Sequence, residues 1–438
     1  MSEAALGLAI DLGTTTLAAS LIDLKSGARL AMTGAMNPQR SHGADVVSRL
    51  DAAVHSEAAL QEMAQLARQE LWRLALEACA MAGVPMSAVG QAAIAGNPAM
   101  QHILLGLPVK SLAFPPYRPL RTEGTMISST QLGWSTVMPV YIFPMPGGFV
   151  GGDTVAFLYG AGVWGGAGKR KSEEAWMRGC GEDAFTHSRG VMFLDMGTNG
   201  EMALVAGDEI WATSAAAGPA FEGGNLTCGM AALLGAISSV VIEGERPRIT
   251  VIGNQAPAGI CGSAAIETVC ELLHHGLLEP GGRLLDSSEI PSNLGARVIR
   301  HNGENAFVLH RDAERQLLLT QGDIRQIQLA KAAIRGGMEV LAERSRIRLE
   351  SLQDVVLTGS FGAVLRPQWL KTVGIFEEGM IDITRFVPEG ALAGVERALL
   401  RDVHYDGVQR LGQRFRVVPL SGTPLFESLF LRQINFPC

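Results

Sequence analysis

The chain is poor in cysteine, and none of its cysteines lies near another in a metal-binding spacing. Six cysteines are spread over 438 residues without a Cys-x-x-Cys pair. Iron–sulfur clusters and structural zinc normally require clustered thiolates. We therefore expect no iron–sulfur cluster in this chain, and reduced, mostly buried thiols instead.

Blocks of basic residues and long hydrophobic runs are also lacking. No basic run is longer than Lys169–Lys171, and the formal net charge is -7, which argues against a surface that neutralises nucleic-acid phosphates. The N-terminus has neither the basic start nor the cleavage site of a signal peptide, and no apolar stretch reaches the length of a membrane span. We expect a cytoplasmic protein with no nucleic-acid partner and no membrane partner.

Glycine, in contrast, is abundant at 52 residues, and one glycine-containing pattern occurs twice. A short apolar strand runs into Asp11–Thr16, with the letters DLGTTT, and another runs into Asp195–Gly200, with the letters DMGTNG. A further apolar strand follows each loop, so the segments 8–24 and 192–206 correspond. A repeat at such long spacing indicates two related lobes.

The composition of these loops suits a nucleotide phosphate. A carboxylate at the end of a strand can hold Mg²⁺, usually through water, and Asp11 and Asp195 are expected to do so and to act in catalysis. Glycine permits a tight turn, while threonine hydroxyl and backbone N–H groups can donate to phosphate oxygens. The alternative is a pair of plain hairpins with Asp capping each turn. The residues expected to contact nucleotide are Gly13, Thr14, Thr15, Thr16, Gly197, Thr198 and Asn199.

Three glycine-containing segments downstream extend this candidate site. A strand at 354–357 runs into Thr358–Gly362, whose flat backbone could carry adenine and ribose. Another glycine-rich segment, Ala217–Asn225, contains an acid that could contact nucleotide or Mg²⁺, or could cap a helix. The third segment, Gly259–Ser263, begins a helix, and the free N–H groups at a helix start suit an anion. The residues expected to bind in these segments are Gly218, Glu222, Gly262, Ser263, Gly359, Ser360 and Gly362.

Asp153 lies at a predicted helix start, in the segment Gly151–Ala156. This segment is similar to a turn of hexokinases in which the Asp is the general base toward the sugar hydroxyl. A base here could instead orient a water molecule for ATP hydrolysis. The alternative role of Asp153 is that of a helix N-cap.

The order of two phosphate loops and an adenosine loop resembles the ASKHA superfamily, which includes actin, Hsp70 and hexokinase. This resemblance implies an α/β, two-lobed, actin-like ATPase fold built from duplicated RNase H-like domains, with a nucleotide cleft between the lobes. We expect lobes at 1–188 and 189–438, an exposed connection at 161–190, and a final helix near 424–433 that could pack back on the first lobe. A long helix is predicted from Gly322 to about Arg346, with Arg325, Lys331 and Arg335 on a solvated face. The alternative for Lys331 is that it reaches the cleft.

A narrower resemblance covers almost the whole chain. The runs IDLGTTTLAASLIDL, AGNPAMQHILLGL, LDMGTNGEMAL, AAAGPAFEGGNLTCGMAALLGAI and LTQGDIRQIQLAKAAIRGGMEVL look like the ATPase domain of the reductive activators of corrinoid proteins. The resemblance implies an ATPase that drives Co(II) corrinoid to Co(I) on a partner protein, and a homodimer. Because we expect no cluster in this chain, a separate ferredoxin-like iron–sulfur protein would supply the electrons.

Three other functions remain open at this point. A small-molecule kinase would use Asp153 as its base. An ATP-switched binding module would use nucleotide without redox chemistry. An activator of 2-hydroxyacyl-CoA dehydratases would need a cysteine-held cluster.

Overall fold

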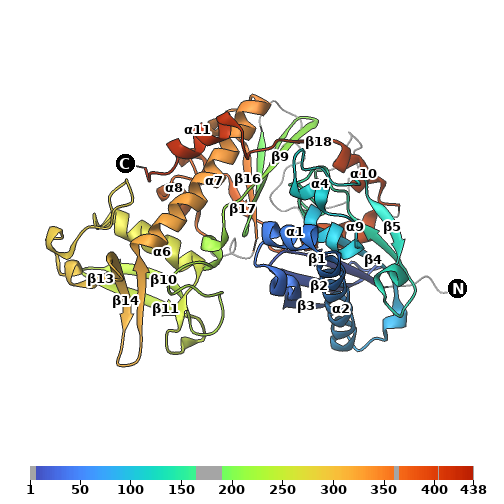
Figure 1. The fold of residues 1–438 in the computed structure, drawn as a ribbon, viewed down its shortest axis with the longest axis horizontal. Coiled ribbons are helices and arrows are strands. Elements are labelled where there is room, and N and C mark those ends of the chain that lie inside the picture. The colour runs from blue at the N-terminus through green and yellow to red at the C-terminus, as the bar shows by residue number, and fades with distance from the viewer. Residues whose placement is uncertain (1–5, 164–189, 360–364, 403, 438) are drawn as a thin grey trace. The chain divides into compact units, whose positions relative to one another are not determined.

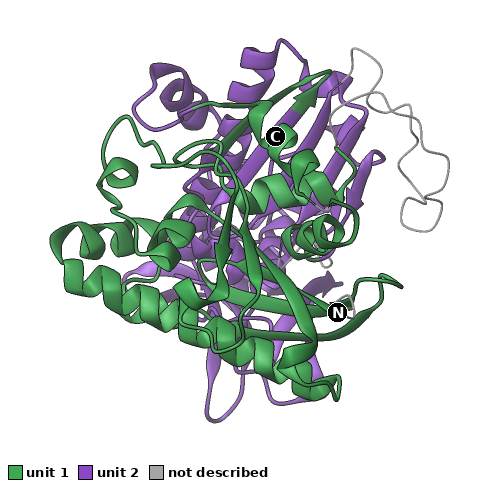
Figure 2. Cartoon of the chain, turned by 90° about the vertical axis from the view of Figure 1, so that its right-hand side faces the viewer, with its two compact units in different colours: residues 1–187, 205–213, 389–418 green, residues 188–204, 214–388, 419–438 purple. Residues whose placement is uncertain are grey.

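The computed structural model describes residues 6–163, 190–359, 365–402 and 404–437 (Figure 1). The chain divides into two compact units (Figure 2). Unit 1 comprises Met1–His187, Val205–Thr213 and Glu389–Val418, and unit 2 comprises Ser188–Leu204, Ser214–Pro388 and Pro419–Cys438. Both units combine mixed sheets with helices, so the predicted α/β class is confirmed.

Unit 1 is built on a six-stranded sheet with the order β3-β2-β1-β4-β6-β5. The first three strands form an antiparallel meander, and β1 then pairs in parallel with β4, which pairs in parallel with β6. The central strand β1 is almost wholly buried, which is typical of a strand covered on both faces. The strands are β1 (Leu6–Leu12), β2 (Thr16–Asp23), β3 (Arg29–Met36), β4 (Val89–Gly96), β5 (Thr125–Ser128) and β6 (Pro139–Ile142).

Helices from distant parts of the chain cover this sheet. The long helix α2 packs against β2 and β3, while α9, from near the end of the chain, packs against β1, β4 and α5. The remaining strands of the unit, β9 and β18, pair in parallel. The elements are α1 (Val46–His55), α2 (Glu57–Met81), α3 (Pro98–Leu105), α4 (Lys110–Ala113), α5 (Gly152–Gly160), β9 (Glu209–Ala215), α9 (Gly390–Arg401), α10 (Asp406–Gln413) and β18 (Phe415–Val417).

Ser56 divides the predicted helical stretch between Asp45 and Ala82 into two helices. Its backbone is extended, which ends α1, and its side chain accepts a hydrogen bond of 3.1 Å from the N–H of Ala59. Serine favours this N-cap position because its hydroxyl satisfies an N–H of the first helical turn.

Unit 2 contains the neighbouring strands β17, β16, β7 and β8, and two three-stranded sheets with the orders β11-β10-β12 and β13-β14-β15. The strands are β7 (Val191–Met196), β8 (Gly200–Ala206), β10 (Ala236–Glu243), β11 (Arg246–Val251), β12 (Gly259–Ile260), β13 (Val298–His301), β14 (Glu304–Arg311), β15 (Gln316–Thr320), β16 (Asp354–Thr358) and β17 (Thr384–Phe386). The helices are α6 (Gly262–His274), α7 (Gln321–Ser345), α8 (Pro367–Thr372) and α11 (Pro424–Arg432).

The last helix of the chain, α11, packs against α7 within unit 2. The chain that follows α11 covers α7 as well, because Lys331 donates to the carbonyl of Asn435 and Phe436 is buried. Arg335 is buried as well, beside Glu339 and Glu377. The expectation of a solvated face is therefore wrong for Lys331 and Arg335, whereas Arg325 is exposed. In the described part of the chain, no helix combines the length and apolar character needed to cross a bilayer.

Candidate functional site

The first glycine loop is the turn between β1 and β2, and its shape depends on Gly13. A Cβ atom at Gly13 would lie 2.4 Å from the carbonyl oxygen of Thr16, so only glycine fits without a shift of the backbone. Asn37, just after β3, stabilises the loop with two hydrogen bonds. Its side-chain amide donates to the Gly13 carbonyl at 2.9 Å, and its backbone N–H donates to the Thr15 carbonyl at 2.8 Å.

Asn97 connects this loop to the start of α3. Its side chain donates to Thr14 Oγ1 at 2.8 Å and accepts from the N–H of Met100 at 3.0 Å. Neither Asn37 nor Asn97 was predicted from the sequence as a positioning residue. For Asn97 the sequence did contain a signal. Asn97 and Pro98 are a typical N-cap and first helical residue, and they directly follow a strand.

The segment just before Asp153 packs against the end of β4. The preceding Gly151 packs on β4, because a Cβ atom there would lie 2.5 Å from the Gly96 carbonyl oxygen. Gly151, rather than Asp153, occupies the N-cap position of α5, so the helix-cap alternative is wrong. Asp153 lies within the first turn, where its Oδ1 accepts from the N–H of Thr154 at 2.7 Å. Burial raises the pKa of the Asp153 carboxyl to about 6.

In unit 2, the second glycine loop joins β7 to β8 and contacts Glu222. The N–H of Gly197 donates to the Asn199 carbonyl at 3.1 Å, which closes the turn. The hydroxyl of Thr198 donates to the Glu222 carboxylate. Burial raises the pKa of Glu222, and the hydrogen bond from Thr198 opposes this rise. Gly218, with φ of 76°, begins the short 3₁₀ helix that carries Glu222.

The third loop begins beside Asp195. Strands β16 and β7 are parallel, and Thr358 is in register with Asp195. A Cβ atom at the following Gly359, which has φ of 112°, would lie 2.9 Å from Asp195 Oδ1. The start of the third loop thus lies directly beside the second glycine loop. Ser360 and Gly362 lie outside the described residues.

The start of α6 packs on the Glu222 segment. A Cβ atom at Gly262 would lie 1.8 Å from the Phe221 carbonyl oxygen and 3.0 Å from the Glu222 nitrogen. The neighbouring Ser263 is buried, and its hydroxyl lies 3.2 Å from Cys261 Sγ. The structure therefore brings Gly262 to Glu222, while the Ser263 hydroxyl contacts protein groups.

These two groups of residues suit a magnesium nucleotide. Mg²⁺ keeps most of its waters and takes only one or two protein carboxylates besides phosphate oxygens. Each unit offers one such carboxylate at the end of a strand, Asp11 in unit 1 and Asp195 in unit 2. Within the described ranges, no three His, Cys, Asp or Glu side chains converge as a metal cage. At positions 13 and 359 an added Cβ atom would meet an oxygen of the protein at 2.4 and 2.9 Å, so both turns require glycine. Backbone N–H groups of such tight turns can bind phosphate oxygens.

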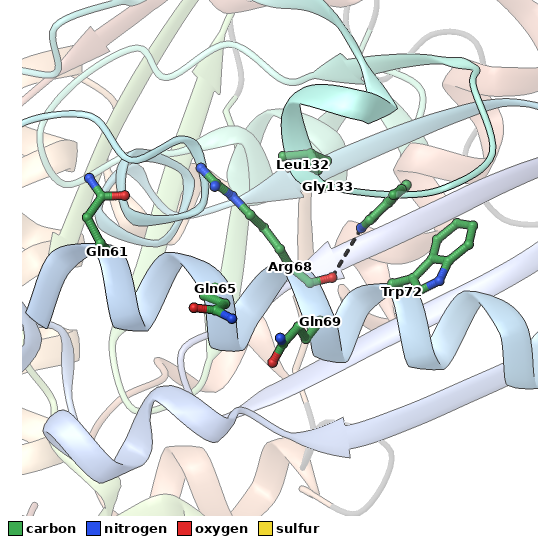
Figure 3. Close-up of a pocket in the computed structure, with 8 residues that line it drawn as sticks. Gln61, Gln65, Arg68, Gln69, Trp72, Leu132 and Gly133 are labelled. Carbon is green, nitrogen blue, oxygen red and sulfur yellow. Dashed lines mark hydrogen bonds between the residues drawn. The ribbon is translucent and has the colours of Figure 1, made fainter. Parts of the chain in front are cut away.

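A hollow of about 400 Å³ lies elsewhere in unit 1, along α2 (Figure 3). Trp134 Nε1 donates to the Arg68 carbonyl at 3.1 Å, and the Trp134 ring lies 5.5 Å from that of Trp72. The lining contains none of the residues predicted to bind nucleotide. The nucleotide hypothesis therefore rests on the glycine loops and not on this hollow.

Comparison with known proteins identifies the family. Residues 189–438 match the model of the C-terminal domain of RACo, the ASKHA domain, and residues 6–164 match the RACo middle region. Corrinoid activation enzyme RamQ of Eubacterium limosum is 30% identical over 409 residues, which cover 90% of this chain but 64% of that protein. The [Co(II) methylated amine-specific corrinoid protein] reductase of Methanosarcina barkeri is 21% identical over 98% of this chain and 77% of its own length.

A solved structure agrees with this assignment. The reductive activator for corrinoid, iron-sulfur protein superimposes with a TM-score of 0.84 at 26% identity, over 100% of this chain and 67% of its own. The predicted ASKHA fold and the resemblance to the reductive activators are thereby confirmed. The chain belongs to the RACo family and contains both its middle region and its C-terminal ASKHA domain.

Proposed function

We propose that this chain uses ATP to drive the reductive activation of a corrinoid protein. The observation that carries the proposal is the pair of glycine loops at Asp11 and Asp195, in a chain whose relatives are named for corrinoid activation. The chain matches about two thirds of the length of RamQ, so the activity of the relatives is transferred here as a proposal.

The reaction adds one electron to the Co(II) corrinoid and yields Co(I). A separate ferredoxin-like iron–sulfur protein supplies the electron. ATP hydrolysis to ADP and phosphate supplies free energy, to the extent that nucleotide binds two states of the protein with different affinity. We further propose that the protein acts as a cytoplasmic homodimer.

The residues of the candidate site have separate roles in this reaction. Thr14, Thr15, Thr16 and the backbone after Gly13 hold phosphate oxygens, and Asn37 and Asn97 keep that loop in place. Asp11 or Asp195 would hold Mg²⁺ through water. Asp153 accepts a proton from the attacking water, since its pKa of about 6 leaves most of it ionised near pH 7.

The test combines the purified chain, Mg²⁺-ATP, a reductant and a methylated-amine-specific corrinoid protein in the Co(II) state. We expect slow basal ATP hydrolysis, faster hydrolysis when the corrinoid protein is added, and ATP-dependent formation of Co(I) in the visible spectrum. Asp153→Asn should lower the ATPase rate by about 10²-fold, within the range for loss of a general base. A corrinoid protein that neither binds nor changes the ATPase rate would contradict the proposal.

The raised pKa of Asp153 also favours a second candidate, a small-molecule kinase. A panel of sugars and carboxylic acids would reveal it. Phosphoryl transfer to one of them, lost in Asp153→Ala, would replace corrinoid activation as the proposed function.

A further inference from the structure

A short apolar loop of unit 2 lies open to solvent. Leu233 and Leu234 are each 64% exposed, and the preceding Ala231 and Ala232 are exposed as well. We call Ala231–Leu234 the apolar loop. It lies in a stretch, 226–242, that contains no charged residue. Four consecutive exposed apolar residues are unfavourable in water, and in natural proteins such exposure usually marks a contact with a partner.

The apolar loop is held in place at both ends. Met230 N–H donates to the Ile260 carbonyl at 2.9 Å, and Gly235 N–H donates to the Ile252 carbonyl at 3.0 Å. Within the loop, Leu233 N–H donates to the Ala231 carbonyl at 2.7 Å. The two leucines are thus presented on an ordered turn, which lowers the entropy cost of docking a partner.

The same backbone links the apolar loop to Glu222 in the candidate nucleotide site. A Cβ atom at Gly229 would lie 1.9 Å from the Gly223 carbonyl oxygen, and one at Gly223 would lie 2.5 Å from the Met230 carbonyl oxygen. The chain on either side of Gly223 is therefore in backbone contact with the base of the apolar loop. Close backbone packing at Gly223 therefore connects the residue next to Glu222 with Met230.

The size of the loop favours a transient contact over a permanent one. A stable interface uses about 20–30 residues on each side, whereas the apolar loop offers four, which suits a transient contact better than a permanent dimer. A partner that must leave after each activation needs such a contact. We propose that the apolar loop docks the corrinoid protein and that its position responds to nucleotide through Glu222. This inference rests on the proposed function.

The experiment compares wild type, the double variant Leu233→Ser/Leu234→Ser and the control variant Leu431→Ser. Leu431, on α11, is 67% exposed and belongs to the same unit, so it matches the two leucines in exposure. The probe is a methylated-amine-specific corrinoid protein in the Co(II) state. We expect the double variant to bind it at least 10-fold more weakly and to lose the stimulated ATPase, with unchanged basal ATPase. The control should behave as wild type.

Two further measurements test whether the loop itself forms the contact. In hydrogen exchange, the amides of 231–234 should gain protection when the corrinoid protein and Mg²⁺-ATP are both present. Because the loop has no charge, the affinity lost in the double variant should be the same at low and high salt.

The outcomes distinguish the inference from the function beneath it. A wild type that shows no stimulation contradicts the proposed function itself. A stimulated wild type together with an equally stimulated double variant overturns only the inference. A double variant that turns a dimer into a monomer while keeping its stimulation would show that the loop contacts a second copy, and would also overturn it.

Discussion

The carboxyl group of Asp153 illustrates how a residue acquires its chemistry from its surroundings. The glycines before it bring the first turn of α5 against β4 and its following loop. Loss of water around the carboxyl group disfavours its charge, and burial is the largest cause of its raised pKa. The N–H of Thr154 works in the opposite direction by stabilising the carboxylate.

This pKa predicts a pH dependence of the ATPase. A general base must be ionised, so the rate should rise with pH and level off above an apparent pKa of about 6. The pH–rate profile of wild type tests this, with Asp153→Asn as the control that lacks the rising limb. The pH dependence of folding stability has the opposite sign to that of the ATPase rate. A raised carboxyl pKa stabilises the fold below the unfolded value near 3.8, and this contribution is lost as pH rises through about 6. A flat wild-type profile between pH 5 and pH 7 would argue against Asp153 as the base.

Some of the site could be predicted at the residue scale because it depends on local sequence. A strand that ends in Asp, one residue and Gly-Thr must turn there, and the structure has a tight turn at Gly13 and at Gly197. Asn37 was missed because its bonds to Gly13 and Thr15 form only when β3 pairs beside β2. The burial of Lys331 could not be predicted for a similar reason, since residues more than a hundred positions later cover it.

At the scale of elements, the crossing of α5 and α9 depends on glycine. A Cβ atom at Gly394 would lie 1.7 Å from the Ala156 carbonyl oxygen, and one at Gly160 would lie 2.8 Å from the Gly394 Cα. The two helices therefore approach backbone to backbone. Because α9 also packs on β1 and β4, this crossing supports the strand that carries Asp11.

Gly394→Ala should accordingly destabilise the protein. The added methyl group forces the helices apart, and overpacking of this kind costs about 1–3 kcal/mol. Urea or thermal unfolding measures the loss. Gly281→Ala is the matched control, because no atom lies within 4 Å of the added Cβ and we expect little change. Equal free energies of unfolding for the two variants would mean that the helices can move apart without loss of stability.

Helix boundaries show where sequence pattern stops being sufficient. The apolar and polar periodicity between Asp45 and Ala82 predicted helix throughout, and the break at Ser56 depends on one capping side chain. The long helix of unit 2 agrees with its predicted range within one residue at each end. Its start coincides with a capping box of Thr320 and Asp323, which the local sequence contains.

For the whole molecule, nucleotide should appear as added stability. A ligand that binds only the folded state at 100 times its Kd stabilises it by about 2.7 kcal/mol. We expect Mg²⁺-ATP to raise the unfolding temperature of wild type, and Asp11→Asn and Asp195→Asn each to reduce that rise. Each rise is measured against the same variant without nucleotide. A full shift in both variants would show that neither carboxylate contributes to nucleotide binding.

The path of the chain through the two units has a consequence for biosynthesis. The sheet of unit 1 precedes unit 2 in the chain, yet α9, which covers β1 and β4, comes from 390–401. During translation, the apolar face of this first sheet stays uncovered while the ribosome adds almost all of unit 2. Unit 2 also remains incomplete until α11 is made. A nascent chain thus exposes two unfinished cores together, and a stop codon before Gly390 would release a product in which neither unit can close.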